Sequence, residues 1–372
     1  MLTRTFDRNP PMNSKISVII PSYNERNNVS PLVKRIDRAL SNYDYSILFV
    51  DDDSSDGTAH LAQALSSKFP IQVLVRRDKR GLASAVTDGL ENTAGQIIVV
   101  MDADLQHPPE LIPELLMKMD DGADLAIASR YVEEGNCEGW GIIRRIISKG
   151  AILIAHLLLP PTSKIQDPMS GFFTFRRRAL ADVKLQPIGY KILLEMLVLG
   201  SFHKVVEVPY TFRNRSSGES KLGTKIQINY LQHIFSLMKR TSELQRVFKF
   251  ILVGLSGVFV NMGLLWALTQ SAGLQLQAAS AIAIESSIIS NFFFNNYFTF
   301  RDRRSPAWKI TLRRLLKFNM VSLVGLAINL GILTLLTTVF GIYYLLANLI
   351  GIVVAALWNY LLSTSWTWRQ QD

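Results

Sequence analysis

The chain has 372 residues, of which 48% are hydrophobic, and it carries 40 Lys and Arg against 30 Asp and Glu. At about 100–200 residues per domain, this length predicts two domains. The charges divide unevenly, because residues 247–372 hold only about 9 basic and 3 acidic side chains, whereas residues 1–246 hold about 31 and 27. This pattern excludes a wholly soluble protein, a disordered chain and a nucleic-acid binder that owes its pI to one basic domain.

Cysteine use and the first residues add two smaller constraints. Cys137 is the only cysteine, which excludes an internal disulfide and a cysteine-rich zinc site. Residues 1–14 form a polar extension that contains Pro10-Pro11, and we expect no secretory signal there.

Residues 15–243 alternate short apolar runs with amphipathic segments. The apolar runs are rich in β-branched residues and predict buried strands at 16–20, 47–50, 71–75, 97–101 and 125–128. The segments between them predict helices at 28–40, 58–68, 82–92 and 110–119. The alternation predicts a doubly wound, Rossmann-like α/β sheet that is mostly parallel, with ligands bound beyond the carboxyl ends of its strands.

Two later segments, about 140–159 and 225–240, combine isoleucine and leucine with basic residues. Basic amphipathic helices of this kind lie in the headgroup plane of a membrane. The alternative is that they pack on the soluble core; beside a membrane domain we favour the interfacial interpretation.

The last third of the chain is an internal repeat. With a shift of about 68 residues, 248–301 aligns without gaps on 316–369, with roughly 17 of 54 positions identical. Each repeat is long enough for two membrane spans of about 20 residues, placed near 250–270, 278–298, 318–340 and 343–364. Basic residues gather on one side of these spans, so the positive-inside rule predicts a multi-pass membrane protein whose N-terminal domain and C-terminus are cytoplasmic. Domain 244–372 is therefore predicted to be a four-helix membrane domain.

Glu285 is the one acid inside a predicted span. Ionisable groups inside membranes are usually functional or paired. A functional group and a neutral carboxyl that bonds to a neighbouring helix are both compatible with the sequence.

Acidic side chains follow the predicted strands. Residues 21–25 place Tyr23 and Glu25 after the first strand, and three aspartates close the second. Asp102, Asp104 and Gln106 follow the fourth strand, and alternation along an extended chain would point them to one side. Two carboxylates and an amide oxygen suit Mg²⁺ or Mn²⁺ bridging a nucleotide diphosphate. A helix cap is the alternative, but a cap uses one acid rather than three oxygen ligands.

Basic residues later in the domain suit phosphate groups. They lie after the fifth strand, at the start of the first amphipathic segment and in the loop 212–221. Arginine and lysine there suit a donor diphosphate and an acceptor phosphate, although each is also compatible with a solvated surface.

Taken together, residues 21–25, 51–58, 102–106, 167–173 and 218–222 resemble the motifs of the dolichol-phosphate mannose synthases, in the GT-A fold glycosyltransferase family 2. Residues 138–141, before Arg144-Arg145, also resemble this subgroup. Residues 247–369 resemble the GtrA-like membrane module.

The resemblance implies a role for each matching residue. The guanosine of GDP-mannose would be held by Pro21, Tyr23, Glu25 and Asp52, with Val50 lining the pocket. The divalent metal would bind Asp102, Asp104 and Gln106, with the backbone of Ala103 near the nucleotide. Arg130, Arg215 and Lys221 would hold donor phosphates, and Arg144, with Ser148, would face the lipid phosphate. Asp104, Arg130 and Arg144 are thereby the expected catalytic residues.

The expected reaction is inverting transfer of mannose from GDP-mannose to a polyprenyl (dolichyl) phosphate at the lipid bilayer. An acceptor phosphate is ionised at neutral pH, so a strong general base is unnecessary. Two alternatives remain: another donor such as UDP-glucose, and a membrane module that helps to translocate the lipid-linked sugar. No nucleic acid is expected as a partner.

Overall fold

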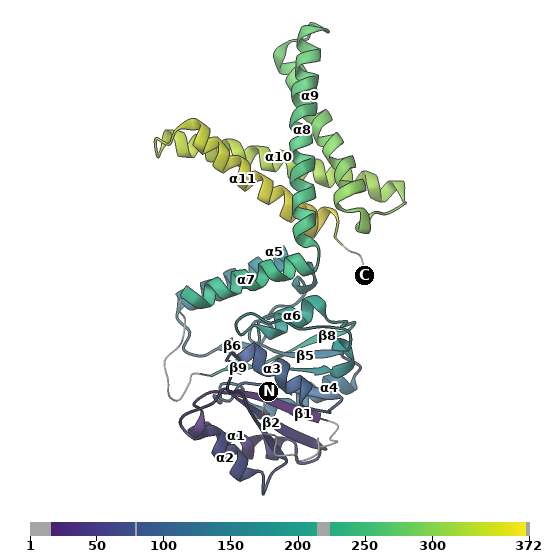
Figure 1. Cartoon of the computed structure of the whole chain (residues 1–372). Helices are drawn as coiled ribbons and strands as arrows, with labels where there is room; N and C mark the ends of the chain where they lie inside the picture. Colours follow the sequence, from purple (N-terminus) through teal and green to yellow (C-terminus); the bar gives the residue numbers. More distant parts are fainter. Residues whose placement is uncertain (1–15, 79, 214–223, 370–372) are drawn as a thin grey trace. The chain divides into compact units, whose positions relative to one another are not determined.

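The computed structural model describes residues 16–78, 80–213 and 224–369. The chain divides into two compact units, Met1–Leu237 and Met238–Asp372. The first is an α/β domain, and the described part of the second is helical (Figure 1).

A seven-stranded sheet forms the centre of the first unit, in the order β3-β2-β1-β4-β7-β5-β8. Every neighbouring pair is parallel except the two pairs that β7 makes, with β4 and with β5. The prediction of a mostly parallel α/β sheet is therefore confirmed. The strands are β1 (Ile16–Ser22), β2 (Tyr45–Asp51), β3 (Ile71–Val75), β4 (Ile97–Val100), β5 (Leu125–Ser129), β7 (Phe173–Arg176) and β8 (Val205–Pro209), and β6 (Asn136–Cys137) pairs with β9 (Thr211–Phe212) outside this sheet.

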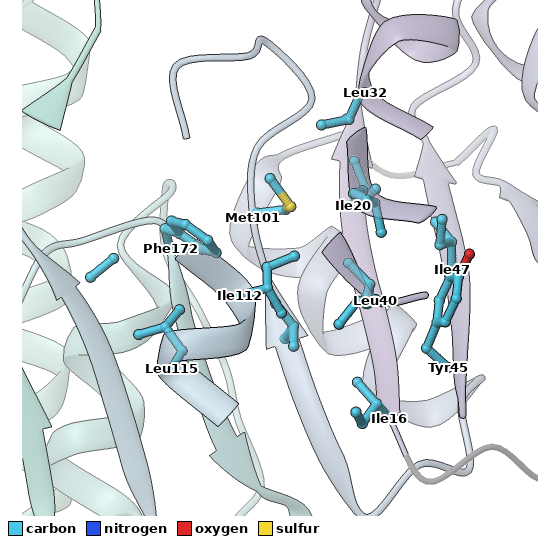
Figure 2. Packing of buried hydrophobic residues seen from close by; sticks show 14 of the residues in the cluster. Ile16, Ile20, Leu32, Leu40, Tyr45, Ile47, Met101, Ile112, Leu115 and Phe172 are labelled. Atoms are coloured by element: carbon cyan, nitrogen blue, oxygen red, sulfur yellow. The ribbon is translucent and has the colours of Figure 1, made fainter. Parts of the chain in front are cut away.

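Hydrophobic side chains fill both faces of the sheet. All seven residues of β1 and of β2 are buried, as expected for parallel strands covered on both sides. On one face, Leu32 of α1 (Arg26–Ala39) and Leu115 of α4 (Ile112–Asp120) belong to one cluster with Ile20 and Ile47, as Figure 2 shows. On the other face, α3 (Leu82–Glu91) and α6 (Ile192–Leu199) pack against alternate residues of the same strands. The shorter α2 (Thr58–Leu65) lies beside α1.

Two further helices of the first unit expose apolar side chains. In α5 (Ile142–Leu158), Ile142 and Ile143 are 78% and 75% exposed. In α7 (Thr224–Arg240), Phe235 is 56% exposed. The Tyr230 hydroxyl of α7 donates to the Ala151 carbonyl of α5 at 2.6 Å, so the two helices are linked directly.

The second unit is built from two helical hairpins. α8 (Glu243–Gln270) packs on α9 (Leu276–Phe294), and α10 (Trp308–Thr338) packs on α11 (Tyr344–Leu362). A π-helical turn follows each hairpin, at Asn295–Thr299 and Ser363–Thr367. The bounds of α9 and α11, and those of the two π turns, differ by 68 residues, which is the offset of the sequence repeat.

Close helix contacts recur at repeat-related glycines. A Cβ at Gly257 would lie 2.3 Å from Nδ2 of Asn291, and a Cβ at Gly325 would lie 2.5 Å from Oδ1 of Asn359. Small residues at these positions let the helices of each hairpin approach closely. Between the hairpins, the rings of Phe300 and Trp368 stack with centroids 4.5 Å apart.

Within the described residues, three helices are long and apolar enough to cross a membrane: Glu243–Gln270, Trp308–Thr338 and Tyr344–Thr367. The expected span at 278–298 corresponds to α9, which falls outside this group because its 19 residues include polar side chains such as Glu285 and Asn291. The Asn319 amide of α10 donates a hydrogen bond to the Glu285 carboxyl, so this acid is paired across the two helices.

Candidate active site

The acidic motif follows β4 at the carboxyl edge of the sheet. β4 ends at Val100, and Leu105 has a left-handed φ of 61°, so residues 102–106 form a turn rather than an extended strand. The expectation that strand alternation aligns Asp102, Asp104 and Gln106 is therefore wrong. A turn brings two of them together instead, because the Gln106 backbone N–H donates to Asp104 Oδ1 at 3.1 Å.

The buried side chain of His107 supports this turn. Its side chain is buried, and its Nδ1 accepts a hydrogen bond from the Asp102 backbone N–H at 3.1 Å. The ring stacks on Phe172, with centroids 5.4 Å apart. Burial lowers the pKa of His107 to about 4, so the imidazole is neutral at pH 7 and Nδ1 remains an acceptor. The neutral ring thus fixes the backbone from which Asp102 projects.

The donor set suits a hard divalent cation. Gln106 Nε2 donates to the Arg213 carbonyl at 2.7 Å. The Gln106 amide oxygen therefore points away from Arg213. Gly171 lies beside Asp102, and a Cβ at Gly171 would lie 3.2 Å from Asp102 Oδ2. Glycine therefore leaves room beside this carboxylate. Two carboxylates and one amide oxygen fit Mg²⁺ or Mn²⁺, with phosphate oxygens and water as further ligands.

The residues expected to hold the nucleoside gather at the ends of β1 and β2. Tyr23 is 39% exposed, and the Glu25 carboxylate accepts from Asn28 Nδ2 at 2.6 Å. Asp52 is nearly buried, with its backbone N–H bonded to the Ser22 carbonyl. These placements leave an exposed ring and two carboxylates along one sheet edge.

Pro21, Val50 and Ala103 occupy buried positions in the same region. Pro21 pairs with Val50 in the β1–β2 ladder, and the Val50 side chain is fully buried in the core. Ala103 is 3% exposed. All three residues are therefore enclosed by the protein.

Sequence reasoning missed the segment between β3 and α3. The Arg80 guanidinium lies 5.2 Å from the centroid of the Tyr23 ring, a cation–π contact. Arg76 forms a buried ion pair with Asp52. No sequence signal pointed to either, since their partners lie 57 and 24 positions away along the chain.

Arg130 is held by a partner that the sequence analysis gave no role. Its Nε and Nη2 donate to Asp167 Oδ2 and Oδ1, both at 2.7 Å, and both side chains are buried. The pair raises the pKa of Arg130 against the opposing effect of burial. The bidentate pair uses two of the five guanidinium N–H donors, so Asp167 orients Arg130 and leaves Nη1 for other partners.

The start of α5 carries a second arrangement of cations and rings. The Arg144 guanidinium lies 4.0 Å from the centroid of the Trp140 ring. The Tyr131 hydroxyl donates to Ser148 Oγ at 2.8 Å, which links the residue after Arg130 to α5. Arg144 and Ser148, the expected contacts of a lipid phosphate, thus lie one helical turn apart on α5.

Lys191 is a further cation that the sequence analysis missed. Its Nζ donates to the Met169 carbonyl at 3.2 Å, and burial, together with nearby Arg130, lowers its pKa to about 8. The charges of Asp102 and Arg144 also act on it, which places Lys191 among the expected site residues. A lysine directly before an apolar helix was the only sequence signal.

The remaining expected phosphate ligands, Arg215 and Lys221, lie outside the described residues. The chain reaches them through Arg213, whose carbonyl bonds to Gln106. Glu195 is fully buried and accepts from the Gln186 backbone N–H at 2.7 Å.

Family models match both parts of the chain. The family model described as "Glycosyl transferase family 2" matches residues 17–184, and the model described as "GtrA/DPMS, transmembrane domain" matches residues 249–368. A dolichol-phosphate mannosyltransferase of Pyrococcus furiosus is 48% identical over 354 residues, which cover 95% of this chain and 99% of that protein. Dolichol-phosphate mannosyltransferases of Mycosarcoma maydis and Saccharomyces cerevisiae are each 38% identical, over 60% and 61% of this chain and 79% and 88% of those proteins.

Among solved structures, glucosyl-3-phosphoglycerate synthase of Mycobacterium tuberculosis has a TM-score of 0.48 and 21% sequence identity, over 62% of this chain and 80% of that one. The family matches and the relative that spans nearly the whole chain carry the assignment. The chain is a glycosyltransferase that belongs to the dolichol-phosphate mannosyltransferase family and joins a family 2, GT-A domain to a GtrA-type membrane domain.

Proposed function

We propose that the chain transfers mannose from GDP-mannose to a polyprenyl (dolichyl) phosphate, with inversion at the sugar carbon, giving polyprenyl β-mannosyl phosphate and GDP. The observation that carries this proposal is the 48% identity, over 95% of the chain, to a protein named dolichol-phosphate mannosyltransferase. The acidic turn supports it as a site for a divalent metal. The surrounding cations support it because both substrates are anions.

The reaction needs alignment more than proton transfer. A phosphate oxygen of the acceptor attacks C1 of mannose, and the bond from C1 to the β-phosphate oxygen breaks, so GDP leaves with the electron pair. Inversion follows from attack opposite the leaving group. No base is required, since the acceptor oxygen is already ionised at neutral pH.

A divalent metal bound by Asp102, Asp104 and Gln106 would stabilise negative charge on the departing diphosphate. Arg130, Arg215, Lys221 and Lys191 would hold donor phosphates. Arg144 and Ser148 would bind the acceptor phosphate, and two anions that otherwise repel are thereby kept in line for displacement. Asp104, Arg130 and Arg144 are the residues on which we expect turnover to depend most.

The membrane arrangement is also a proposal. Residues 15–243 form the catalytic domain and residues 244–372 a domain of four spans in two repeats, supported by the common 68-residue offset of the helices. The exposed isoleucines of α5 and the apolar face of α7 support an interfacial position for both. The basic residues around 301–317 support a cytoplasmic catalytic domain and C-terminus.

A transfer assay with purified full-length protein tests the function. Radiolabelled GDP-mannose, UDP-glucose and GDP-glucose are each combined with polyprenyl phosphate and with polyprenol, with and without Mg²⁺ or Mn²⁺. We expect labelled lipid only with GDP-mannose, polyprenyl phosphate and metal. Faster transfer from UDP-glucose, or transfer to polyprenol, would contradict the proposal.

A further inference from the structure

Helix α7 has one buried face and one exposed apolar face. His233 and Leu237, one helical turn apart, are 1% and 0% exposed. Ile228, Leu231 and Phe235 are each slightly more than half exposed. A polar, titratable side chain thus stands on the face of α7 that packs against protein, where an apolar residue would be expected.

The buried histidine faces a buried acid of another helix. His233 Nε2 lies 3.5 Å from Oε2 of Glu195 in α6, and Glu195 is fully buried. The other oxygen of Glu195, Oε1, accepts from the Gln186 backbone N–H, so this carboxylate is fixed in the α/β domain. A buried pair of this kind adds little stability compared with apolar side chains of similar size, but it can fix the register of one helix on another.

Helix α7 meets the same part of the domain one turn earlier. Gly189 has a left-handed φ of 79°, and a Cβ there would lie 3.5 Å from the Cβ of Asn229. Asn229 and His233 are four residues apart and therefore lie on one side of α7. Two contacts with the segment 189–195 define both the position and the rotation of α7.

Between these two contacts, Tyr230 ties α7 to α5. Its hydroxyl donates to the Ala151 carbonyl at 2.6 Å. Ala151 follows Ser148 by three residues and Arg144 by seven, so all three lie along one side of α5. Ser148 is also held by the Tyr131 hydroxyl, so Tyr230 is one of several restraints, and its loss should shift α5 rather than release it.

We propose that His233 and Glu195 are positioning residues for the acceptor phosphate. The pair sets the register of α7 on the domain, and Tyr230 transmits this register to α5, which carries Arg144. The inference rests on the proposed binding of polyprenyl phosphate at Arg144 and adds that α7 acts on this site through α5. None of these contacts involves the ends of β1 and β2, so binding of the donor nucleoside should be insensitive to them.

The experiment measures transfer by the full-length protein in detergent and determines KM for polyprenyl phosphate and for GDP-mannose separately. The variants are Tyr230→Phe, His233→Leu, the double variant of both, and His233→Gln, whose amide nitrogen replaces Nε2 as a donor to Glu195. Tyr230→Phe leaves the segment 189–195 untouched. Tyr45→Phe is the matched control, because it removes a hydroxyl that bonds to Asp37 at 2.7 Å and joins β2 to α1.

We expect the KM for polyprenyl phosphate to rise about three- to tenfold in Tyr230→Phe and in His233→Leu, the loss typical of one hydrogen bond. It should stay within about twofold of wild type in His233→Gln and Tyr45→Phe, as should the KM for GDP-mannose in every variant. Since both residues act through α7, the double variant should raise the KM by less than the product of the single effects. A merely structural role would lower the melting temperature without separating the two KM values.

An unchanged KM for polyprenyl phosphate in Tyr230→Phe would overturn the inference, and so would an equal rise of both KM values. A KM raised as much in His233→Gln as in His233→Leu would overturn the role of the pair. If His233→Leu does not fold, Tyr230→Phe, which removes a single oxygen atom, decides alone. A wild type that transfers no mannose to polyprenyl phosphate would instead refute the proposed function, and the inference with it.

Discussion

The buried imidazole of His107 predicts a loss of stability in mild acid. Its ring is packed against Phe172, and its Nδ1 accepts from the Asp102 backbone N–H, so a proton at Nδ1 would both charge a buried ring and remove this hydrogen bond. The perturbation is a decrease of pH from 7.5 to 4.5, compared between the wild type and His107→Asn. An asparagine Oδ1 keeps the acceptor but does not titrate.

The magnitude follows from the pKa of His107. An unfolded chain binds the proton near pH 6.5, whereas the folded protein binds it only near pH 4. Stability is therefore complete above pH 6.5, falls as the pH drops below that value, and levels off below 4. The full difference is about 3 kcal/mol, which for a domain of this size is roughly 6–12 °C in melting temperature.

Thermal unfolding of the full-length protein in detergent measures this effect. The difference in melting temperature between wild type and His107→Asn should change in favour of the variant as the pH falls from 6.5 to 4.5. Other titrating groups are common to both proteins, so the difference isolates His107. A difference that is constant across this range would refute the reasoning that the imidazole is buried in its neutral form.

Four further predictions concern the site and the membrane domain. Asp104→Ala should reduce transfer by at least 100-fold and remove its dependence on divalent metal; an active, metal-independent variant would contradict the metal site. Arg144→Ala should raise the KM for polyprenyl phosphate about tenfold or more and leave the KM for GDP-mannose nearly unchanged, and the opposite pattern would reject that assignment. Lys191 has a pKa of about 8, so the KM for GDP-mannose should rise between pH 7 and 9, a rise that Lys191→Arg should abolish if the charge is responsible. Gly257→Ala should destabilise the membrane domain by about 1–3 kcal/mol, measured by thermal unfolding, because its Cβ would overlap a neighbouring helix. Gly263→Ala is the matched control, since no described atom lies within 4 Å of that Cβ, and equal effects of the two would contradict the packing argument.

The local pattern of the sequence predicted the first five strands along the chain because each is a short, mainly apolar run. It missed β7 and β8, which include charged residues such as Arg176 and Glu207. Their strand character depends on pairing with β4 and β5, which are distant along the chain. Pairing of this kind has no local signal.

The candidate site, too, was predicted only in part from the sequence. The acids of residues 102–106 are contiguous, so their composition alone indicated a metal site. The geometry expected for them was wrong, because a turn at Leu105 replaces the expected extended strand. His107, Arg76 and Lys191 acquire their roles through burial and through partners in other elements, which composition and spacing do not reveal.

The reversed strand β7 joins two halves of the sheet. β4 and β5 have no direct pairing in the order of the strands, and each pairs with β7 instead. Because β7 runs in the opposite direction, the chain enters it at the edge where β4 ends, which delivers Gly171 beside Asp102. During synthesis, the surroundings of Asp102 therefore stay incomplete until more than 170 residues have emerged, so truncated products would keep the acidic turn without Gly171 beside it.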